Sequence, residues 1–385
     1  MARERREDDV ELRATESDVT HTGSGDRRLR VLHLIIVLGE TNGQYNEHCL
    51  PLMHERDLSI CTYFRPQLEW PKEITVFAGD DTLRGFFRAL GRALDAGEYD
   101  VVHAHAPHTG ALLVAGLAVH PRRWRLFRKL VYTVQDSYYD YKPRNKALML
   151  PAIATSRRVV FCGHAAYDSY PRAWKRLVGK RARVVQNAAD LERVARAVST
   201  SGPIDDSTFD VVSVGRLEKV KDPMTVLSAF RRADDERSRL TFVGAGSLEE
   251  SLAREIDSSR LGDRVALAGL VPRDDVFARC AQADLFVSAS HGEGLPVAVI
   301  EAMAAGCPVV LSDIPHHREV ADGADFVPFV PTGDVEGFAR EIERFRRMAP
   351  EARRDIGQEG RKVVTARFGL PTMHAGYENV YREIL

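Results

Sequence analysis

The feature of this sequence that most constrains its fold is the alternation of short apolar runs with helical patterns. Each run is only a few residues long and largely apolar, as in strands that are buried on both faces of a parallel sheet. The clearest runs are Val31–Leu38, Val101–His103, Leu130–Val134, Val159–Cys162, Phe209–Val214, Leu240–Val243, Arg264–Ala268, Leu285–Ser288 and Val309–Leu311. Helical patterns lie between them, for example at Thr82–Leu94, Met224–Arg232, Leu248–Ile256 and Leu295–Ala305. The alternation predicts an α/β fold in which helices cover parallel sheets.

The chain has 385 residues, which is more than one hydrophobic core usually organises, so we expect two domains. The alternation of strands and helices restarts after a polar, turn-rich segment at 199–207, which we interpret as a linker. We predict two doubly wound, Rossmann-like domains at 29–198 and 208–368, followed by a helical segment at 369–385. Residues 1–28 alternate acids and bases, which predicts a disordered charged tail. Ligands of such sheets bind beyond the carboxyl ends of the strands, so a cleft between the domains is expected.

The apolar runs and the cysteines indicate the cellular compartment in which the protein acts. The longest uncharged apolar stretches, Leu32–Leu38 and Ala111–Val119, are less than half of the roughly 20 residues that a membrane span requires. The charged tail lacks the apolar centre of a secretory signal. The five cysteines are scattered without CxxC spacing, and their odd number disfavours a disulfide framework. We therefore expect a cytoplasmic protein with reduced thiols.

Charge is distributed unevenly along the chain. Residues 29–190 hold 23 lysines and arginines against 15 aspartates and glutamates, whereas residues 191–385 hold 25 against 32. The excess is concentrated in the basic segment, residues 121–183, where 16 bases face 3 acids. Aromatic residues are interleaved with these bases, namely Trp124, Phe127, Tyr138, Tyr139 and Trp174. One hypothesis is peripheral docking to an anionic membrane with aromatic anchoring, and the alternative is an ordinary set of solvated helix faces. No nucleic-acid recognition motif is present.

The most informative stretch runs from Ser288 to Gly306 and predicts a strand end, a glycine-bearing turn and a helix. Pro296 suits a first helical turn, and Gly294 allows the backbone to approach a ligand closely. The unpaired amides and the dipole of that helix start favour a phosphate. Glu293 precedes the helix and Glu301 lies about two turns into it, so the two carboxylates are expected to reach different parts of one extended ligand.

A second stretch, GRLEKVKD, follows the run Phe209–Val214, and Gly215 opens its turn. Arg216 and Lys221 are suited to converge on a diphosphate, the first as a planar fork and the second as a point charge. The alternative is a pair of solvated surface bases. Two further turns that contain glycine follow the next predicted strands, Thr241–Ser247, which includes Gly244, and Ala268–Pro272. The ordered series of such turns is the specific signal.

With these motifs the sequence resembles the retaining nucleotide-sugar glycosyltransferases of GT-B fold, family 4, over essentially all of residues 30–385. The resemblance lies in GRLEKVKD, LTFVGAGSLEESL, ADLFVSASHGEGLPVAVIEAMAAGCPVV and the segment QNAAD at Gln186–Asp190. It implies a GT-B architecture and an enzyme that transfers a hexose-type sugar from a nucleotide-sugar to a glycan or lipid-linked acceptor. In that family the C-terminal helix, here Thr372–Leu385, crosses back to the first domain.

The resemblance also implies roles for individual residues. Arg216 and Lys221 would hold the donor diphosphate, and Glu301 would bind the ribose hydroxyls. Glu293 would contact the donor sugar. The backbone near Pro296–Val297 would meet phosphate. The other residues expected to line the donor site are Gly215, Gly244, Gly294, Leu295, Leu270, Val271, Gly39, Gly43 and Gln135, with the backbone near Leu270 and Val271 against the nucleobase.

Departures from the family pattern are confined to the first domain. Gln135 stands where many relatives have a histidine, and its amide can donate a hydrogen bond but cannot carry charge. Gly39 and Gly43 are separated by three residues where relatives often have paired glycines. His103 and His105, at the end of a predicted strand, are either site residues or buried, hydrogen-bonded core residues.

The sequence contains no DxD motif, and the pair Asp234–Asp235 at a charged helix end is a poor substitute for one. Family members need no metal, so we expect neither a metal nor a cofactor besides the donor. Two alternative functions stay open at this point. Gln135 is compatible with a catalytically idle GT-B protein that binds a nucleotide or regulates a partner. A nucleotide-sugar epimerase of similar architecture is disfavoured by GRLEKVKD together with E-x7-E.

Overall fold

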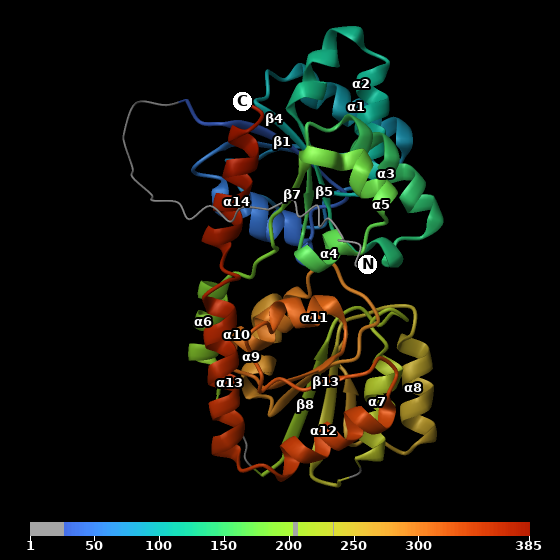
Figure 1. Cartoon of the computed structure of the whole chain (residues 1–385), viewed down its shortest axis with the longest axis vertical. Coiled ribbons are helices and arrows are strands. Elements are labelled where there is room, and N and C mark those ends of the chain that lie inside the picture. The colour runs from blue at the N-terminus through green and yellow to red at the C-terminus, as the bar shows by residue number, and fades with distance from the viewer. Residues whose placement is uncertain (1–26, 203–206, 234) are drawn as a thin grey trace, which may run out of the picture.

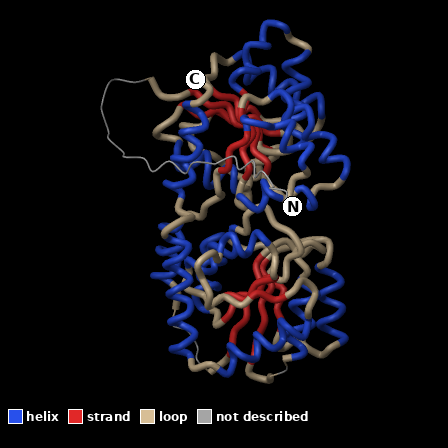
Figure 2. Tube along the Cα trace, viewed as in Figure 1, coloured by secondary structure: helices blue, strands red, loops and turns tan. Residues whose placement is uncertain are grey.

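The computed structural model describes residues 27–202, 207–233 and 235–385, which form two α/β domains stacked along the long axis of the molecule (Figure 1). Nearly all of the charged tail predicted at 1–28 lies outside the described residues, as does the middle of the linker predicted at 199–207. Helices lie on both faces of each sheet (Figure 2). No helix within the described ranges is both long enough and apolar enough to cross a membrane.

The first domain is built on a parallel sheet of seven strands. These are β1 (Arg30–Ile35), β2 (Asp57–Thr62), β3 (Thr75–Phe77), β4 (Val101–Ala104), β5 (Leu130–Val134), β6 (Arg158–Phe161) and β7 (Ala182–Val184). Its α-helices are α1 (Leu83–Asp95), α2 (Pro107–Ala118), α3 (Pro143–Thr155), α4 (His164–Asp168) and α5 (Arg172–Val178). The next helix, α6 (Leu191–Thr200), lies on the second domain, where its buried Val194 and Ala197 join the core (Figure 1). Shorter or irregular helical segments are η1 (Gln44–Cys49), η2 (Leu50–Leu52), η3 (Pro121–Lys129), η4 (Tyr138–Asp140) and η5 (Gly179–Arg181).

The second domain is built on a parallel sheet of six strands, which are β8 (Phe209–Val214), β9 (Ser238–Val243), β10 (Val265–Leu267), β11 (Leu285–Ser288), β12 (Val309–Ser312) and β13 (Phe329–Val330). The remaining helices are α7 (Pro223–Arg232), α8 (Glu249–Ser258), α9 (Arg273–Gln282), α10 (Val297–Ala304), α11 (Pro315–Val320), α12 (Val335–Arg347), α13 (Pro350–Thr365) and α14 (Leu370–Arg382). The fold class predicted from the alternation is confirmed.

Both sheets have the doubly wound strand order. The first runs β3-β2-β1-β4-β5-β6-β7 and the second β10-β9-β8-β11-β12-β13, so the order reverses between β1 and β4 and between β8 and β11. A crevice opens beyond the carboxyl ends of the strands at such a switch point, and ligands bind there. The segments that follow β8 and β11 are the two stretches in which the sequence concentrates its candidate residues.

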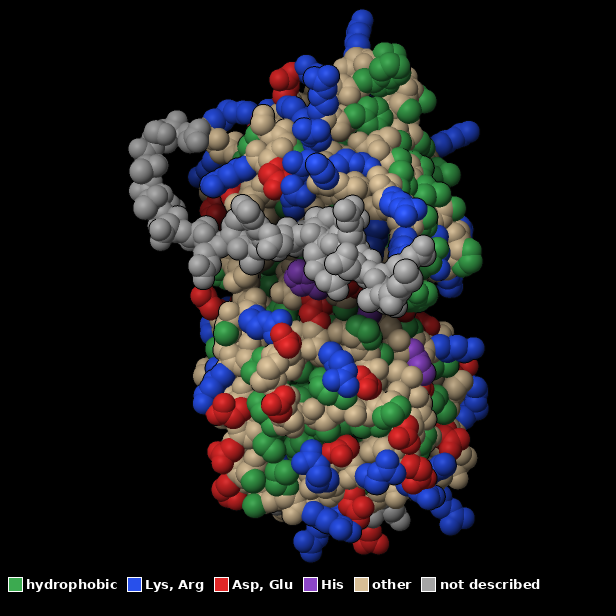
Figure 3. Space-filling model, in the orientation of Figure 1, with side chains coloured by type: hydrophobic (Ala, Val, Ile, Leu, Met, Phe, Trp, Pro, Cys, Tyr) green, Lys and Arg blue, Asp and Glu red, His purple; other side chains and the backbone are tan. Residues whose placement is uncertain are grey.

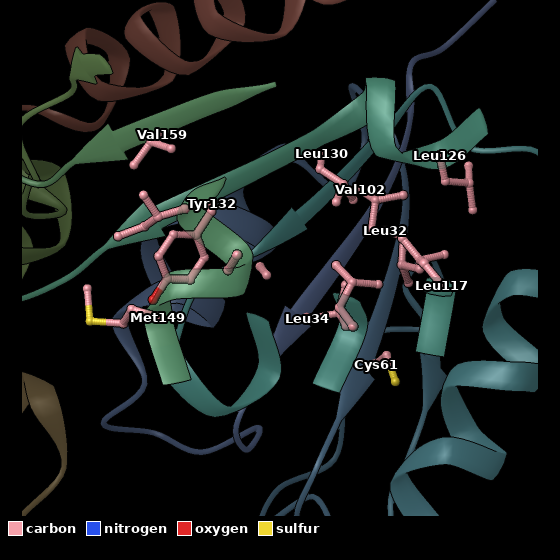
Figure 4. Close-up of a cluster of buried hydrophobic side chains, with 14 of the residues drawn as sticks. Leu32, Leu34, Cys61, Val102, Leu117, Leu126, Leu130, Tyr132, Met149 and Val159 are labelled. Atoms are coloured by element: carbon pink, nitrogen blue, oxygen red, sulfur yellow. The ribbon is translucent and has the colours of Figure 1, made fainter. Parts of the chain in front are cut away.

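The period of two along each strand divides the side chains of the first sheet between two cores. Leu32 and Leu34 of β1 pack with Val102 of β4 beneath α1, α2 and α3 (Figure 4). The alternate residues Val31 and Ile35 face the opposite core, to which α14 contributes buried side chains from the far end of the chain. The last helix therefore covers one face of the first sheet (Figure 1).

Polar side chains also connect α14 to that face. The hydroxyl of Tyr381 lies 2.7 Å from Nδ1 of His103 and 3.1 Å from Nε2 of His48, and all three side chains are buried. Nε2 of His103 lies 2.7 Å from the hydroxyl of Thr133 on β5. Since buried polar groups need partners, this network fixes how the last helix sits on the sheet.

Replacing Tyr381 by phenylalanine tests this network. Removal of the hydroxyl leaves ring nitrogens of His103 and His48 without that partner, so we expect the free energy of unfolding to fall by about 1–3 kcal/mol. Equilibrium urea unfolding measures the loss. Tyr139→Phe is the matched control, because Tyr139 is 77% exposed. A Tyr381→Phe protein as stable as its parent would show that the network contributes nothing.

Candidate active site

Three candidate residues meet at the switch point of the second sheet. β8 and β11 are neighbours in that sheet, so the turns that follow them lie side by side. These turns place Arg216, Lys221 and Glu293 on the wall of one cavity of about 590 Å³. The opposite wall belongs to the first domain, where Asp136 and Asp140 follow β5 and Lys142 precedes α3. The cavity therefore lies between the two domains, as the sequence predicted for the cleft.

Glu293 is the most tightly held member of this group. Its side chain is buried, forms an ion pair with Lys221 and accepts a hydrogen bond of 2.8 Å from the hydroxyl of Ser290. Burial opposes ionisation of the carboxyl, but the charges of Lys221 and His317 and the hydrogen bonds from Lys221 and Ser290 together lower its pKa. Glu293 is thus a carboxylate at neutral pH, and Lys221 is its counter-ion.

Arg216 is exposed, and no ion pair or hydrogen bond of its side chain occurs among the described residues. Its guanidinium is available to an anion in the cavity. The turn that carries it depends on glycine at two positions. Gly215 has φ +154° and Gly244 has φ +137°, and a Cβ on Gly244 would overlap the carbonyl oxygen of Gly215. A side chain at Gly244 would separate the ends of β8 and β9, whereas at Gly215 it is the backbone conformation that favours glycine.

The helix that follows Glu293 begins later than the sequence suggested. α10 starts at Val297, and Pro296 occupies its N-cap position instead of its first turn. Glu301 is therefore little more than one turn into α10, whereas the sequence placed it about two turns in. A Cβ on Gly294 would overlap the carbonyl oxygen of Gln135, so this glycine permits close approach of the first domain. Backbone of the first domain thus occupies the position beside Gly294 that the sequence predicts for a ligand.

An ion-pair triad that the sequence did not predict lies at Glu301. Arg273, the first residue of α9, pairs with Glu301 at 2.5 Å and also with Glu47 of η1 in the first domain. Burial raises the pKa of Glu47 to about 7, although the charge of Arg273 acts to lower it. Burial likewise raises the pKa of Glu301, again opposed by Arg273. The triad thus joins the domains through one guanidinium that serves two buried carboxyls.

The structure separates the remaining candidates. Gly43, Gln135 and Val297 line a second interdomain cavity of about 50 Å³, together with Glu47 and His105. Leu270 is 71% exposed at the surface, where its side chain can cover a flat ligand. Leu295 packs in the core of the second domain, and Val271 packs against that core. The other candidates line neither of these two cavities within the described part of the chain. They are Gly39, Gly215, Gly244, Gly294, Leu270, Val271, Leu295, Pro296 and Glu301.

The histidines of the first domain form a buried cluster. Ring nitrogens of His33, His103 and His105 lie within 4.8 Å of one another, which is close enough to consider a metal ion. Nδ1 of His33 and Nε2 of His105 are 3.0 Å apart and share a hydrogen bond, and both nitrogens of His103 already have partners. Burial lowers the pKa of His105 to about 3, so its ring is neutral. The arrangement is a hydrogen-bonded core, although Nε2 of His33 and Nδ1 of His105 have no protein partner.

The basic segment does not form one face. It runs from η3 through α3 to β7, and several of its bases are already paired, such as Arg123 with Asp95 and Arg183 with Glu383. Of its aromatic residues, Trp124 and Tyr139 are exposed, whereas Phe127, Tyr138 and Trp174 pack against the core of the first domain. On the face that Figure 3 shows, lysines and arginines lie at several places on the first domain.

Sequence reasoning missed five site residues, which are Glu47, Asp136, Asp140, Lys142 and Arg273. Asp136 lies two residues after the end of β5, and its place at a strand end was a signal that could have found it, whereas Asp140 ends the short helix η4. Burial raises the pKa of Asp140 to about 6, helped by the charges of Asp136 and Glu293. Glu47 and Arg273 carry no such signal, because 226 residues separate them and each looks like an ordinary surface charge.

Comparison with known proteins agrees with this geometry. Residues 196–363 match the family Glycosyl transferases group 1, and residues 71–193 match Glycosyltransferase Family 4. A Bacillus subtilis protein named as a glycosyltransferase, EpsD, is 29% identical over 298 residues, which cover 72% of this chain and 75% of that protein.

Two further similarities concern a named enzyme and a solved structure. The UDP-Gal:alpha-D-GlcNAc-diphosphoundecaprenol alpha-1,3-galactosyltransferase of Escherichia coli is 26% identical over 76% of this chain and 77% of its own length. The sucrose-phosphate synthase of Thermosynechococcus elongatus superposes with a TM-score of 0.76 at 18% identity, covering 93% of this chain and 99% of that chain. This last likeness shows the fold. The chain belongs to the glycosyltransferases of GT-B fold, with a Glycosyltransferase Family 4 domain followed by a Glycosyl transferases group 1 domain.

Proposed function

We propose that the protein is a retaining, metal-independent glycosyltransferase that moves a hexose-type sugar from a nucleoside-diphosphate sugar to a hydroxyl of a glycan or lipid-linked acceptor. The observation that carries this proposal is the convergence of Arg216, Lys221 and Glu293 on one interdomain cavity at the switch point of the second sheet. The name of the Escherichia coli relative, with its UDP-Gal donor, supports a nucleotide-sugar donor.

The charges of the cavity suit the departure of a diphosphate. Breaking the anomeric C–O bond leaves positive charge on the sugar and adds negative charge to the leaving diphosphate. Arg216 and Lys221 are cations on the cavity wall where that negative charge would grow, and positive groups at such a place stabilise a transition state strongly. They supply the charge neutralisation that a metal ion provides elsewhere, which supports metal independence. Glu293 is ionised on the same cavity wall, where its negative charge would stabilise the sugar as it becomes cationic.

Donor binding requires Lys221 to change partners. In the structure its ammonium pairs with Glu293, so an arriving diphosphate competes with that carboxylate. The exchange places Lys221 on the phosphate and releases an oxygen of Glu293 to a sugar hydroxyl. The retained anomeric configuration is inferred from the resemblance of the E-x7-E stretch to retaining enzymes, with Glu293 and Glu301 as its two carboxylates.

A donor panel tests the proposal directly. We expect the protein to release nucleotide from at least one of a set of UDP-, GDP- and ADP-sugars, at a rate that a chelator such as EDTA does not change. Proton NMR of the product should show the anomeric configuration of the donor. Nucleotide binding without turnover of any donor would favour the idle GT-B alternative, and inversion at the anomeric carbon would contradict the retaining assignment.

We also propose that the protein contacts anionic membranes through the basic segment, and here η3 is the best candidate. Trp124 is 55% exposed on η3, next to the exposed bases Arg122, Arg125 and Arg128. An indole among arginines suits the head-group region of an anionic bilayer. We expect co-sedimentation with phosphatidylglycerol vesicles and little with phosphatidylcholine vesicles, with salt and Trp124→Ala each weakening it. Equal partitioning to both vesicles would remove the idea.

A further inference from the structure

Arg273 holds the side chain of Glu301 in place at the domain interface. Its Nη2 donates a hydrogen bond of 2.5 Å to Oε1 of Glu301, and its Nη1 donates to Oε1 of Glu47 on the first domain. Its Cζ lies 5.7 Å from the centroid of the Phe277 ring. A planar guanidinium that is attached at both ends has few other orientations, so the carboxylate of Glu301 is also restricted to one orientation.

The second oxygen of Glu301 is available for a further hydrogen bond. Within the described part of the chain, Oε2 has no hydrogen-bond partner, and the side chain keeps 10% of its surface accessible. An ionised carboxyl has about four acceptor positions, so the bond from Arg273 leaves capacity for the hydroxyls of a ribose. Burial raises the pKa of Glu301, and the charge and hydrogen bond of Arg273 oppose this rise, which favours the accepting, ionised form.

Arg273 also connects Glu301 to the segment that follows β10. This segment contains Leu270 and Val271, which under the proposed function lie against the nucleobase, and α9 begins at Arg273 directly after it. α9 packs against α10, and Figure 1 shows both helices at the end of the second domain that faces the first. One side chain thus joins the segment expected to contact the base to the carboxylate expected to contact the ribose.

We propose that Arg273 is a positioning residue for donor recognition, which holds Oε1 of Glu301 so that Oε2 receives the ribose hydroxyls of the nucleotide. Glu47 anchors the guanidinium from the first domain. This inference rests on the proposed function and adds the residue on which its preference for a ribonucleotide depends. Arg273 acts here through Glu301 and not through its own contact with the ribose, so its effect should disappear when either the ribose hydroxyls or the carboxylate is removed.

Paired nucleotides test the inference on the full chain. Titration calorimetry gives the dissociation constants of UDP, GDP and ADP, and that of the dideoxy form of the tightest of them, which lacks both ribose hydroxyls. The ribose ratio is the dissociation constant of the dideoxy form divided by that of the ribonucleotide. Since hydrogen bonds to a charged group are stronger than neutral ones, we expect a ratio of at least about ten in the parent protein. Equal binding of the two forms overturns the proposal.

Variants show whether Arg273 acts through Glu301. Glu301→Gln and Arg273→Met should each lower the ribose ratio to less than about three, because the hydroxyls lose a positioned, charged acceptor. The affinity for the dideoxy form should change less than about twofold in either variant. The protein with both substitutions should have the same ratio as Glu301→Gln alone, since two residues that act through one contact are not additive.

The control lies beside the positioning residue. Arg193→Met breaks an ion pair with Asp274, the neighbour of Arg273 on α9, and should keep the parent ratio. If Arg273→Met does not fold, Arg273→Met combined with Glu47→Gln replaces it, because this protein leaves no unpaired carboxylate at position 47. The proposal is overturned if Arg273→Met weakens both nucleotide forms alike, if it keeps the parent ratio, or if its loss adds to that of Glu301→Gln.

The donor panel keeps this test separate from that of the proposed function. If no donor is turned over, the proposed function fails, whereas the ribose ratio still decides the role of Arg273, because an idle GT-B protein also binds a nucleotide. If a donor is turned over and the ratio does not depend on Arg273, this inference alone fails. Absence of binding by all three nucleotides contradicts both.

Discussion

Replacing Lys221 by alanine is expected to lower the rate of sugar transfer by about 10²–10³-fold. Under the proposed function the ammonium is one of two cations at the place where a departing diphosphate gains charge, and the loss of one such group typically costs roughly 3–4 kcal/mol of transition-state stabilisation. Arg216→Ala is expected to have an effect of the same order. Rates of nucleotide release under saturating donor measure both losses.

The loss of Lys221 has a second consequence that helps to identify its role. Lys221 is the counter-ion of the buried Glu293, and its charge helps to lower the pKa of that carboxyl. In the variant this cause disappears, so the pKa of Glu293 rises and the acidic fall of the residual activity should begin at a higher pH than in the parent. Lys180→Ala removes an exposed lysine of the first domain and is the matched control. A Lys221→Ala protein with more than a tenth of the parent rate would contradict the assignment.

Most of the fold could be predicted from the sequence because strands that are buried on both faces appear in it as short apolar runs. The runs at Leu130–Val134, Phe209–Val214 and Leu285–Ser288 are strands with those same bounds. Four strands, β2, β3, β7 and β13, were not among the predicted runs. The last three are edge strands of two or three residues, which leave little periodicity to detect. β2 is a buried interior strand, but Asp57, Ser59 and Thr62 interrupt its apolar run.

The candidate site was predictable only where its residues lie in turns that follow predicted strands. Arg216 and Lys221 follow one strand and Glu293 follows its neighbour, so the rule for switch points was enough to bring them together. Arg273 and Glu47 meet across the domain interface, and no local pattern encodes which surface charges such an interface buries. The start of α10 was placed too early because proline is accepted both at the N-cap, as here, and in the first turn.

Replacing Arg273 by methionine should produce the largest loss of stability. The guanidinium serves Glu47 and Glu301, and the side chains of all three residues are at most 16% exposed. Removal of one partner from a buried ion pair leaves uncompensated charge and typically costs about 3–5 kcal/mol, which should be seen by urea unfolding at pH 8. Arg193→Met breaks a more exposed ion pair with Asp274 and should cost less than about 1 kcal/mol.

The pH dependence distinguishes a loss of charge pairing from a loss of packing. Folding raises the pKa of Glu47 from 4.5 to about 7, so between these pH values the folded protein holds a proton that the unfolded chain releases. The contribution of Glu47 to the free energy of unfolding therefore falls as the pH rises from 4.5 to about 7. Arg273 limits that loss, so its removal raises the pKa of Glu47 and Glu301 further. The destabilisation by Arg273→Met should therefore be larger at pH 8 than at pH 5, where the carboxyls take up protons. Adding Glu47→Gln should restore part of the stability at pH 8. A loss that is equal at both pH values, and that Glu47→Gln does not relieve, would mean that Arg273 acts through packing alone.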